Sequence, residues 1–203
     1  DDHTEVLEAN RLNIPVYKRQ DILEALLKDD FVIAIAGTHG KTTTTAMTTH
    51  LLHECDASPS YIVGGIMANT GTNAGVGKYE IFVIEADEYD NAFWGISANV
   101  VILTNVEYDH PDFFKTQEDM LNSFRKFLDN MREHATLCVC IDSPYALKLA
   151  DEQKAKGRRV YTYSTQKEAD LCVKTIQVDG DKTHFEVNPS QLVVNEAFER
   201  ITL

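Results

Sequence analysis

The sequence predicts an α/β fold: a mostly parallel sheet flanked by helices, with a small β-hairpin or antiparallel sheet near the C-terminus. Strand-like and helix-like segments alternate from Phe31 to Tyr163, and such alternation builds parallel sheets from βαβ units. The strand-like segments are continuous apolar runs, as expected for strands that helices cover on both faces. After Ala169 the pattern changes to short strands around an Asp-Gly turn, which is typical of an antiparallel hairpin.

The individual elements follow from the same patterns. Strands are predicted at Phe31–Ala36, Tyr61–Val63, Ile81–Glu85, Val100–Asn105, Ala135–Ile141 and Arg159–Tyr163. Helices are predicted at Lys41–Glu54, Thr116–Asn130 and Pro144–Lys156. Thr116 with Asp119 resembles a capping box, and Ser143 before Pro144 is a common helix start. The hairpin pairs Leu171–Val178 with Thr183–Val187, and a last strand is predicted at Phe198–Leu203.

The first thirty residues have a different character. Thr4–Leu12 is helix-like, Ile14–Tyr17 is strand-like and Ile22–Leu27 is an amphipathic helix-like run. We therefore expect residues 1–30 to be the tail of a preceding domain with its linker, and residues 31–203 to be a further domain that is truncated.

Composition and charge exclude several classes of function. The chain of 203 residues is 43% hydrophobic and 25% charged, as in ordinary globular proteins. No apolar run approaches the roughly 18 residues of a membrane span, and the first residues lack the features of a signal peptide. These observations predict a cytoplasmic protein that does not bind membranes, and the net charge of −13 argues against nucleic acid as a partner.

The four cysteines are predicted to be reduced thiols, since no secretory signal precedes them. Cys138 and Cys140 lie two residues apart in an apolar run, so on a strand they share one face. Because no CxxC or histidine cluster accompanies them, we interpret them as buried core residues rather than metal ligands.

The segment GTHGKTTTT, Gly37–Thr45, lies between a buried strand and a helix. Backbone N–H groups at such a turn and helix start favour phosphate, so the segment predicts the phosphate loop of a P-loop-type sheet. The expected contacts are Gly37, Thr38, His39, Gly40, Lys41, Thr42 and Thr43. Lys41 is placed to reach the β- and γ-phosphates, and the Thr42 hydroxyl to ligate Mg²⁺. Ile35 stands where the usual pattern has its first glycine, so the interpretation depends on the position between strand and helix.

Two further strand ends carry polar side chains. IFVIEADEYD places Glu85, Asp87, Glu88 and Asp90 after one strand, and VVILTNVEYDH places Asn105, Asp109 and His110 after another. A period of two sets Glu85 and Asp87 on one face. Because ligands bind at the carboxyl ends of parallel strands, we expect Thr42, Glu85 and His110 to converge as ligands for one or two Mg²⁺ ions. The alternatives are a solvated acidic turn and a structural histidine.

The segment Gly64–Gly77 is rich in glycine and asparagine. Glycine permits close approach of the backbone, and the Asn73 amide both donates and accepts hydrogen bonds. The composition favours a substrate-facing loop over a merely flexible connection.

Together these residues resemble the Mur ligase family, specifically the central ATP-binding domain of the branch that adds L-alanine to UDP-N-acetylmuramate. The resemblance rests on GTHGKTTTT, GTNAGVG at Gly71–Gly77, EADEYD at Glu85–Asp90 and TNVEYDHPD at Thr104–Asp112. IPVYKRQDILEALL also resembles the end of the family's N-terminal, UDP-binding domain. His39 favours this branch, since members with other substrates commonly carry asparagine there.

The resemblance implies roles for individual residues. Lys41, Glu85 and His110 would be the catalytic residues, with Lys41 on the transferring phosphate and the other two, with Thr42, on Mg²⁺. His39 would lie near the muramoyl carboxylate. Thr72 and Asn73, in the glycine-rich loop, would be the other substrate contacts. No lysine stands out for the carbamylated role that some Mur ligases use.

The implied reaction is ATP-dependent amide-bond formation through an acyl phosphate on the lactyl carboxylate of UDP-N-acetylmuramate, which the amine of L-alanine attacks. The sequence contains neither the His-Asn motif that the family uses around adenine nor its C-terminal domain. We therefore expect the chain alone to hold nucleotide without catalysing ligation. The sequence does not indicate an oligomeric state.

Several alternatives stay open. A ligase that recycles murein tripeptide onto UDP-N-acetylmuramate has a similar EADEYD motif, but carries extra residues where this chain has only Asn91–Asn99. A folate polyglutamate synthase-like ligase or another P-loop transferase is a second alternative, although the folate loop normally reads GTNGKGS. A nucleotide-binding module without chemistry is a third.

Overall fold

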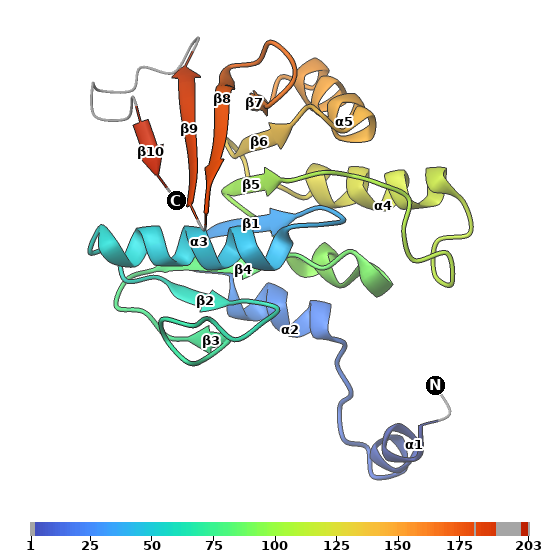
Figure 1. The fold of residues 1–203 in the computed structure, drawn as a ribbon. Coiled ribbons are helices and arrows are strands. Elements are labelled where there is room, and N and C mark those ends of the chain that lie inside the picture. Colours follow the sequence, from blue (N-terminus) through green and yellow to red (C-terminus); the bar gives the residue numbers. More distant parts are fainter. Residues whose placement is uncertain (1–2, 181, 190–199, 203) are drawn as a thin grey trace.

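The computed structural model describes residues 3–180, 182–189 and 200–202, which form one ten-stranded sheet with helices on both faces (Figure 1). The strand order is β10-β9-β8-β7-β6-β5-β1-β4-β2-β3. The strands from β2 to β8 in this order pair in parallel, whereas β3, β9 and β10 pair antiparallel with their neighbours. The predicted α/β class, including antiparallel strands near the C-terminus, is confirmed.

The strand bounds follow the predicted runs closely. They are β1 Phe31–Ala36, β2 Ser60–Ile62, β3 Ala74–Gly75, β4 Ile81–Glu85, β5 Val100–Leu103, β6 Thr136–Cys140, β7 Arg159–Ser164, β8 Leu171–Asp179, β9 Lys182–Pro189 and β10 Arg200–Thr202. The short strand β3 was not predicted. Of the strand predicted at Phe198–Leu203, residues 200–202 form β10, and residues 198, 199 and 203 lie outside the described residues.

The sheet separates two apolar cores, because alternate residues of a strand face opposite sides. Val32, Ala34 and Ala36 of β1 belong to the larger core, and Ile35 of the same strand belongs to the smaller one. This two-sided burial explains why β1 is a continuous apolar run. Packing on both faces also holds β1 in place, and β1 leads directly into the glycine-containing turn at Gly37.

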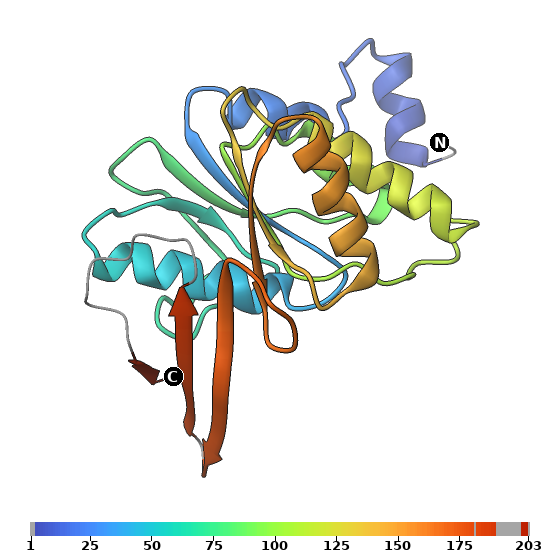
Figure 2. The same cartoon turned by 90° about the horizontal axis from the view of Figure 1, so that it is seen from above.

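Helices cover the two faces unequally (Figure 2). The smaller core lies under α3, Lys41–Glu54, whose Ala46 and Leu52 pack against it. The larger core lies under α2 Arg19–Leu26, the 3₁₀ helix η1 Tyr89–Gly95, α4 Gln117–Asp129 and α5 Pro144–Ala155.

The predicted starts of α4 and α5 are confirmed. The Thr116 hydroxyl accepts the Asp119 N–H at 3.1 Å, and the Asp119 carboxylate accepts the Thr116 N–H at 2.9 Å. Ser143 caps α5 through the Ala146 N–H, with Pro144 at the first helical position. The 3₁₀ helix η1 was not predicted from the sequence.

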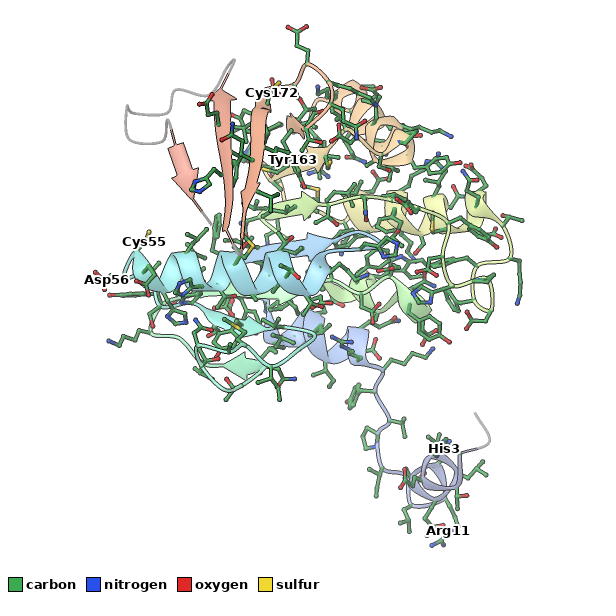
Figure 3. All side chains as sticks on the ribbon, viewed as in Figure 1. His3, Arg11, Cys55, Asp56, Tyr163 and Cys172 are labelled. Carbon is green, nitrogen blue, oxygen red and sulfur yellow. The ribbon has the colours of Figure 1, made fainter. Side chains whose placement is uncertain are left out.

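The N-terminal segment lies apart from the sheet. Helix α1, Thr4–Arg11, has no buried residue, and His3 and Arg11 lie well away from the body (Figure 3). The strand predicted at Ile14–Tyr17 is wrong, since these residues form no strand. Ile14 is 54% and Tyr17 65% exposed, and none of the described strands pairs with them to supply the hydrogen bonds that a strand needs.

Helix α2 is different, because it packs into the larger core. Leu23 and Leu27 are 5% and 2% exposed. A Cβ atom at Gly95 would lie 2.0 Å from the Gln20 carbonyl oxygen, so η1 and α2 touch at the backbone. The Arg132 guanidinium donates to the carbonyl oxygens of Leu27, Lys28 and Asp30 at 2.6–3.1 Å. The chain is therefore tied to the sheet from α2 onward, and the domain boundary at residue 30 stays a prediction.

All four cysteines are free, and Cys55 at the end of α3 lies far from Cys172 on β8 (Figure 3). Cys138 and Cys140 share a face of β6 as predicted, but they are half-buried rather than fully buried. The opposite face of β6, with Leu137 and Val139, is the one that reaches the core. Among the described residues, no helix combines the length and apolarity that crossing a membrane requires.

Candidate nucleotide and metal site

The predicted phosphate loop joins β1 to α3 with two unusual backbone angles. Gly37 has φ 134° and Gly40 has φ 78°, both in the region that favours glycine. The first intrahelical bond of α3 runs from the Thr44 N–H to the Gly40 carbonyl oxygen at 3.0 Å. No side chain caps this helix start, so the N–H groups of its first turn point into the loop. Such an arrangement binds anions.

The neighbouring β5 end braces the loop. Asn105 accepts the Thr38 N–H with its backbone oxygen at 3.1 Å and the His39 N–H with its side-chain oxygen at 2.8 Å. The Thr104 hydroxyl donates to the His39 carbonyl oxygen at 2.6 Å. A Cβ at Gly37 would lie 2.2 Å from the Thr104 hydroxyl oxygen, so the loop needs glycine there. The sequence reasoning placed Asn105 at a strand end but missed this bracing role.

The Lys41 ammonium uses its N–H donors in hydrogen bonds to the protein itself. It donates to the carbonyl oxygens of Gly37 and Thr38 at 2.7 and 3.2 Å, and to both carboxylate oxygens of Glu88 at 2.8 and 3.1 Å. The Lys41 side chain is 13% exposed and that of Glu88 only 2%. Burial raises the pKa of Glu88 above its usual value, and the bonds from Lys41 oppose this rise without cancelling it.

Glu85 forms a second acid contact with the helix start. The Thr42 hydroxyl donates to one Glu85 carboxylate oxygen at 3.0 Å, and the Gly64 N–H donates to the other at 2.6 Å. A Cβ at Gly64 would lie 2.6 Å from that carboxylate. The glycine pair after β2 therefore makes room for Glu85 beside Thr42, as a hydroxyl–carboxylate pair open to solvent.

His110 lies at the same edge, but beside Glu88 rather than beside Glu85. Its Nε2 atom is 3.8 Å from the nearer Glu88 oxygen. Its backbone has φ 53°, and its N–H donates to its neighbour Asp109 at 2.7 Å. The Tyr89 ring meets the His110 ring edge-on at 5.0 Å between centroids.

The three predicted Mg²⁺ ligands thus lie at one edge of the sheet, in two separate contacts. Among the described residues, no three His, Cys, Asp or Glu side chains form a group that would hold a metal unaided. The hydroxyl and carboxylate oxygens of Thr42 and Glu85 match the oxygen ligands that Mg²⁺ prefers. The predicted metal set stays a prediction, with Thr42 and Glu85 as its best-supported pair.

The threonines of helix α3 divide into two groups. Thr42 and Thr43 are exposed in the first turn of α3. The hydroxyls of Thr45, Thr48 and Thr49 instead donate to the carbonyl oxygens four residues earlier, at 2.7–2.8 Å. The sequence alone does not separate Thr45 from Thr42 and Thr43, because all three belong to the run TTTT at Thr42–Thr45.

The three predicted substrate residues are all exposed. His39 lies on the phosphate loop, with its Nε2 atom 3.8 Å from a Glu107 carboxylate oxygen. The Asn73 carbonyl oxygen accepts the Val63 N–H at 2.8 Å, and the Thr72 hydroxyl lies 2.9 Å from the Tyr61 hydroxyl. Both contacts hold the glycine-rich segment against β2, whose carboxyl end is at the site.

The chain matches the family model of the Mur ligase middle domain over residues 35–198. The UDP-N-acetylmuramate–L-alanine ligase of Thermobifida fusca is 39% identical over 189 residues, which are 93% of this chain and 40% of that protein. The ligase of the same name from Rhodopseudomonas palustris (strain BisA53) is 39% identical over 198 residues, 98% of this chain and 42% of that protein. The chain therefore spans about two fifths of the length of these relatives.

Solved structures show the same fold. The UDP-N-acetylmuramate–alanine ligase MurC from Thermotoga maritima superposes with a TM-score of 0.82 at 24% identity, over all of this chain and 44% of that one. The UDP-N-acetylmuramate:L-alanyl-gamma-D-glutamyl-meso-diaminopimelate ligase from Neisseria meningitides gives 0.80 at 25% identity, over 93% of this chain and 62% of that one. The family model covers most of the sheet together with its phosphate loop, and the chain accordingly belongs to the Mur ligase middle-domain family.

Proposed function

We propose that this chain is the ATP-binding domain of an enzyme that joins L-alanine to UDP-N-acetylmuramate. The observation that carries the proposal is the start of α3, where Thr42 contacts Glu85 at the end of β4 and Lys41 contacts Glu88, three residues further on. The choice of L-alanine is supported by relatives that are named UDP-N-acetylmuramate–L-alanine ligase and are 38–40% identical to this chain. Because the chain matches only about 40% of their length, the activity and both substrates belong to the proposal. The cytoplasmic location also stays a prediction.

The residues of this chain would bind the triphosphate. The N–H groups at the start of α3 and the Lys41 ammonium would receive the phosphate oxygens. Thr42 and Glu85 would hold Mg²⁺, with His110 as the predicted third protein ligand. A bound Mg²⁺ supplies positive charge that offsets the phosphates.

The proposed reaction has two displacements. A carboxylate oxygen of the muramoyl lactyl group attacks the γ-phosphorus of ATP, and ADP leaves. The amine of L-alanine then attacks the acyl carbon, loses a proton and displaces inorganic phosphate. Lys41 would stabilise the charge on the transferring phosphoryl group. His39, Thr72 and Asn73 are the proposed substrate contacts.

Two of the alternative functions stay open. The tripeptide ligase shares the fold at a TM-score of 0.80, so the fold does not distinguish the acceptor amine. A nucleotide-binding domain without chemistry of its own is what we expect of this chain alone. Neither alternative changes the proposed roles of Lys41 and Thr42.

Two measurements test the proposal. Isothermal titration of this chain with Mg²⁺ and a non-hydrolysable ATP analogue should show binding at one site. In the longer protein, phosphate release should depend on UDP-N-acetylmuramate together with L-alanine, and the murein tripeptide should not replace L-alanine. Phosphate release that depends on the tripeptide would mean that the tripeptide, and not L-alanine, is the amine substrate. If this chain binds no nucleotide, the proposed function is refuted altogether.

A further inference from the structure

Glu88 is a buried carboxylate at the phosphate loop, and the proposed function gives it no task. It follows β4 and precedes η1, and its side chain is only 2% exposed. Its neighbours in the same motif differ, because Asp87 is half-buried and Asp90 is exposed. A carboxylate buried this deeply is costly unless it is paired, and its partner is Lys41.

Lys41 has no donor left for a ligand. An ammonium group has three N–H donors, and here they serve the Gly37 oxygen, the Thr38 oxygen and the Glu88 carboxylate. A phosphate oxygen can bond to Lys41 only if one of these acceptors gives way. The contact to Thr38, at 3.2 Å, is the longest of the three, whereas the charged contact to Glu88 at 2.8 Å is the strongest in kind.

Glu88 is held so that it stays beside Lys41. The next helix, η1, is anchored by Phe93, which stacks on Phe127 at 4.5 Å and meets Phe124 edge-on at 5.3 Å. In addition, the Nε2 atom of His110 lies 3.8 Å from Glu88 Oε1, the oxygen to which Lys41 donates at 3.1 Å. Glu88 therefore faces the Lys41 ammonium at the start of α3 and the His110 imidazole in the loop after β5.

The charge of Glu88 offsets that of Lys41. While the two are paired, the loop offers an incoming phosphate little net positive charge. If the carboxylate were a neutral amide of the same shape, the ammonium could keep a hydrogen bond to it while its whole charge acted on the phosphate. The interaction of unit charges a few ångströms apart at a partly buried site is large enough to change the affinity for a phosphate measurably.

We propose that Glu88 is a positioning residue that competes with the terminal phosphate of the nucleotide for the Lys41 ammonium, and so limits the affinity of the site for Mg-nucleotide. This inference rests on the proposed nucleotide-binding function and deepens it. The pairing keeps Lys41 in place when no nucleotide is bound, at the expense of ground-state affinity. A lower ground-state affinity need not slow the reaction, because binding the ground state tightly does not by itself accelerate the chemical step.

The test compares variants of this chain in titrations with Mg²⁺ and a non-hydrolysable ATP analogue. Glu88→Gln removes the charge and keeps the shape, so we expect affinity to rise about tenfold. Glu88→Asp retracts the carboxylate from Lys41, and we expect a smaller rise of about two- to threefold. Asp90→Asn is the matched control: it removes one charge from the same motif at an exposed position with φ 50°, which asparagine tolerates, and affinity should stay within about twofold.

The outcomes separate this inference from the proposed function. Structural damage does not raise affinity. A higher affinity in Glu88→Gln, without a rise in Asp90→Asn, therefore supports competition between Glu88 and phosphate for Lys41. Unchanged or weaker binding in Glu88→Gln overturns it, as does an equal rise in Asp90→Asn. If thermal unfolding shows that Glu88→Gln does not fold, the same criteria apply to Glu88→Asp. Wild-type chain that binds no Mg-nucleotide refutes the proposed function, and this inference with it.

Discussion

Lys41 and Thr42 are adjacent in sequence, and each contacts a glutamate of the same EADE segment, but the two contacts have opposite surroundings. The Lys41–Glu88 pair is buried, with side chains 13% and 2% exposed. Thr42 is exposed and Glu85 is only half-buried, between the Thr42 hydroxyl and the Gly64 N–H. The first contact is a buried ion pair, whereas the second stays open to solvent. The comparison teaches that one short acidic motif supplies both a buried and a half-buried carboxylate, because β4 ends at Glu85 and Glu88 lies beyond it, at the start of η1.

The largest expected effect comes from breaking the buried ion pair. In Lys41→Met, the affinity for the ATP analogue should fall by at least about a hundredfold, since charged bonds to phosphate are lost. The free energy of unfolding should fall by on the order of 3 kcal/mol, because Glu88 loses its buried partner. Titration and urea unfolding measure both quantities, with the exposed Lys78→Met as a control. Normal binding by Lys41→Met would show that the phosphate loop is misassigned.

A smaller, selective effect is expected at the open contact. Glu85→Gln should lower the affinity for the ATP analogue about tenfold in Mg²⁺ and leave Mg²⁺-free binding nearly unchanged. Stability should change by less than about 0.5 kcal/mol, since the Gln oxygen can still accept the Gly64 N–H. Titrations with and without Mg²⁺ test this, and Asp87→Asn provides a charge-matched control. Equal losses in both conditions would contradict a metal role for Glu85.

The smallest effect should come from Gly64→Ala. The added Cβ would meet the Glu85 carboxylate at 2.6 Å, and this flexible side chain, rather than the backbone, should move away. We expect about a threefold loss of Mg²⁺-dependent affinity with little change in stability. In the Glu85→Gln variant, Gly64→Ala should cause a smaller further loss of affinity, because the effects of interacting positions are not additive. Full additivity in a double-mutant cycle would mean that Gly64 does not act through Glu85.

The sequence predicted the sheet and the edge at which the polar residues meet, because continuous apolar runs and a glycine-containing strand-to-helix turn are local signals. It did not distinguish Glu88 from Asp87. Counting by two placed Asp87 beside Glu85, but that period holds only within a strand, and β4 ends at Glu85. The segment that follows leads into the 3₁₀ helix η1, where Asp90 and Asn91 have φ 50° and 56°, and the sequence carries no clear signal for this conformation.

The same limit explains the strand wrongly predicted at Ile14–Tyr17. Its apolar β-branched residues suit a strand, but a strand also requires a neighbour, and neighbours are set by tertiary structure. Thr104 and Asn105 are similar, since their bonds to the loop depend on β5 lying beside β1. Contacts between distant segments are what single-sequence reasoning lacks.

The attachment of α2 has a practical consequence for anyone shortening this protein. A clone that begins at Phe31 would remove Leu23 and Leu27 from the larger core. It would also leave the Arg132 guanidinium without the Leu27, Lys28 and Asp30 carbonyl oxygens, and the Gly95 surface bare where Gln20 now touches it. A clone that begins just before Arg19 keeps all of these and discards only the segment with exposed apolar side chains, so it is the shorter version to express and crystallise.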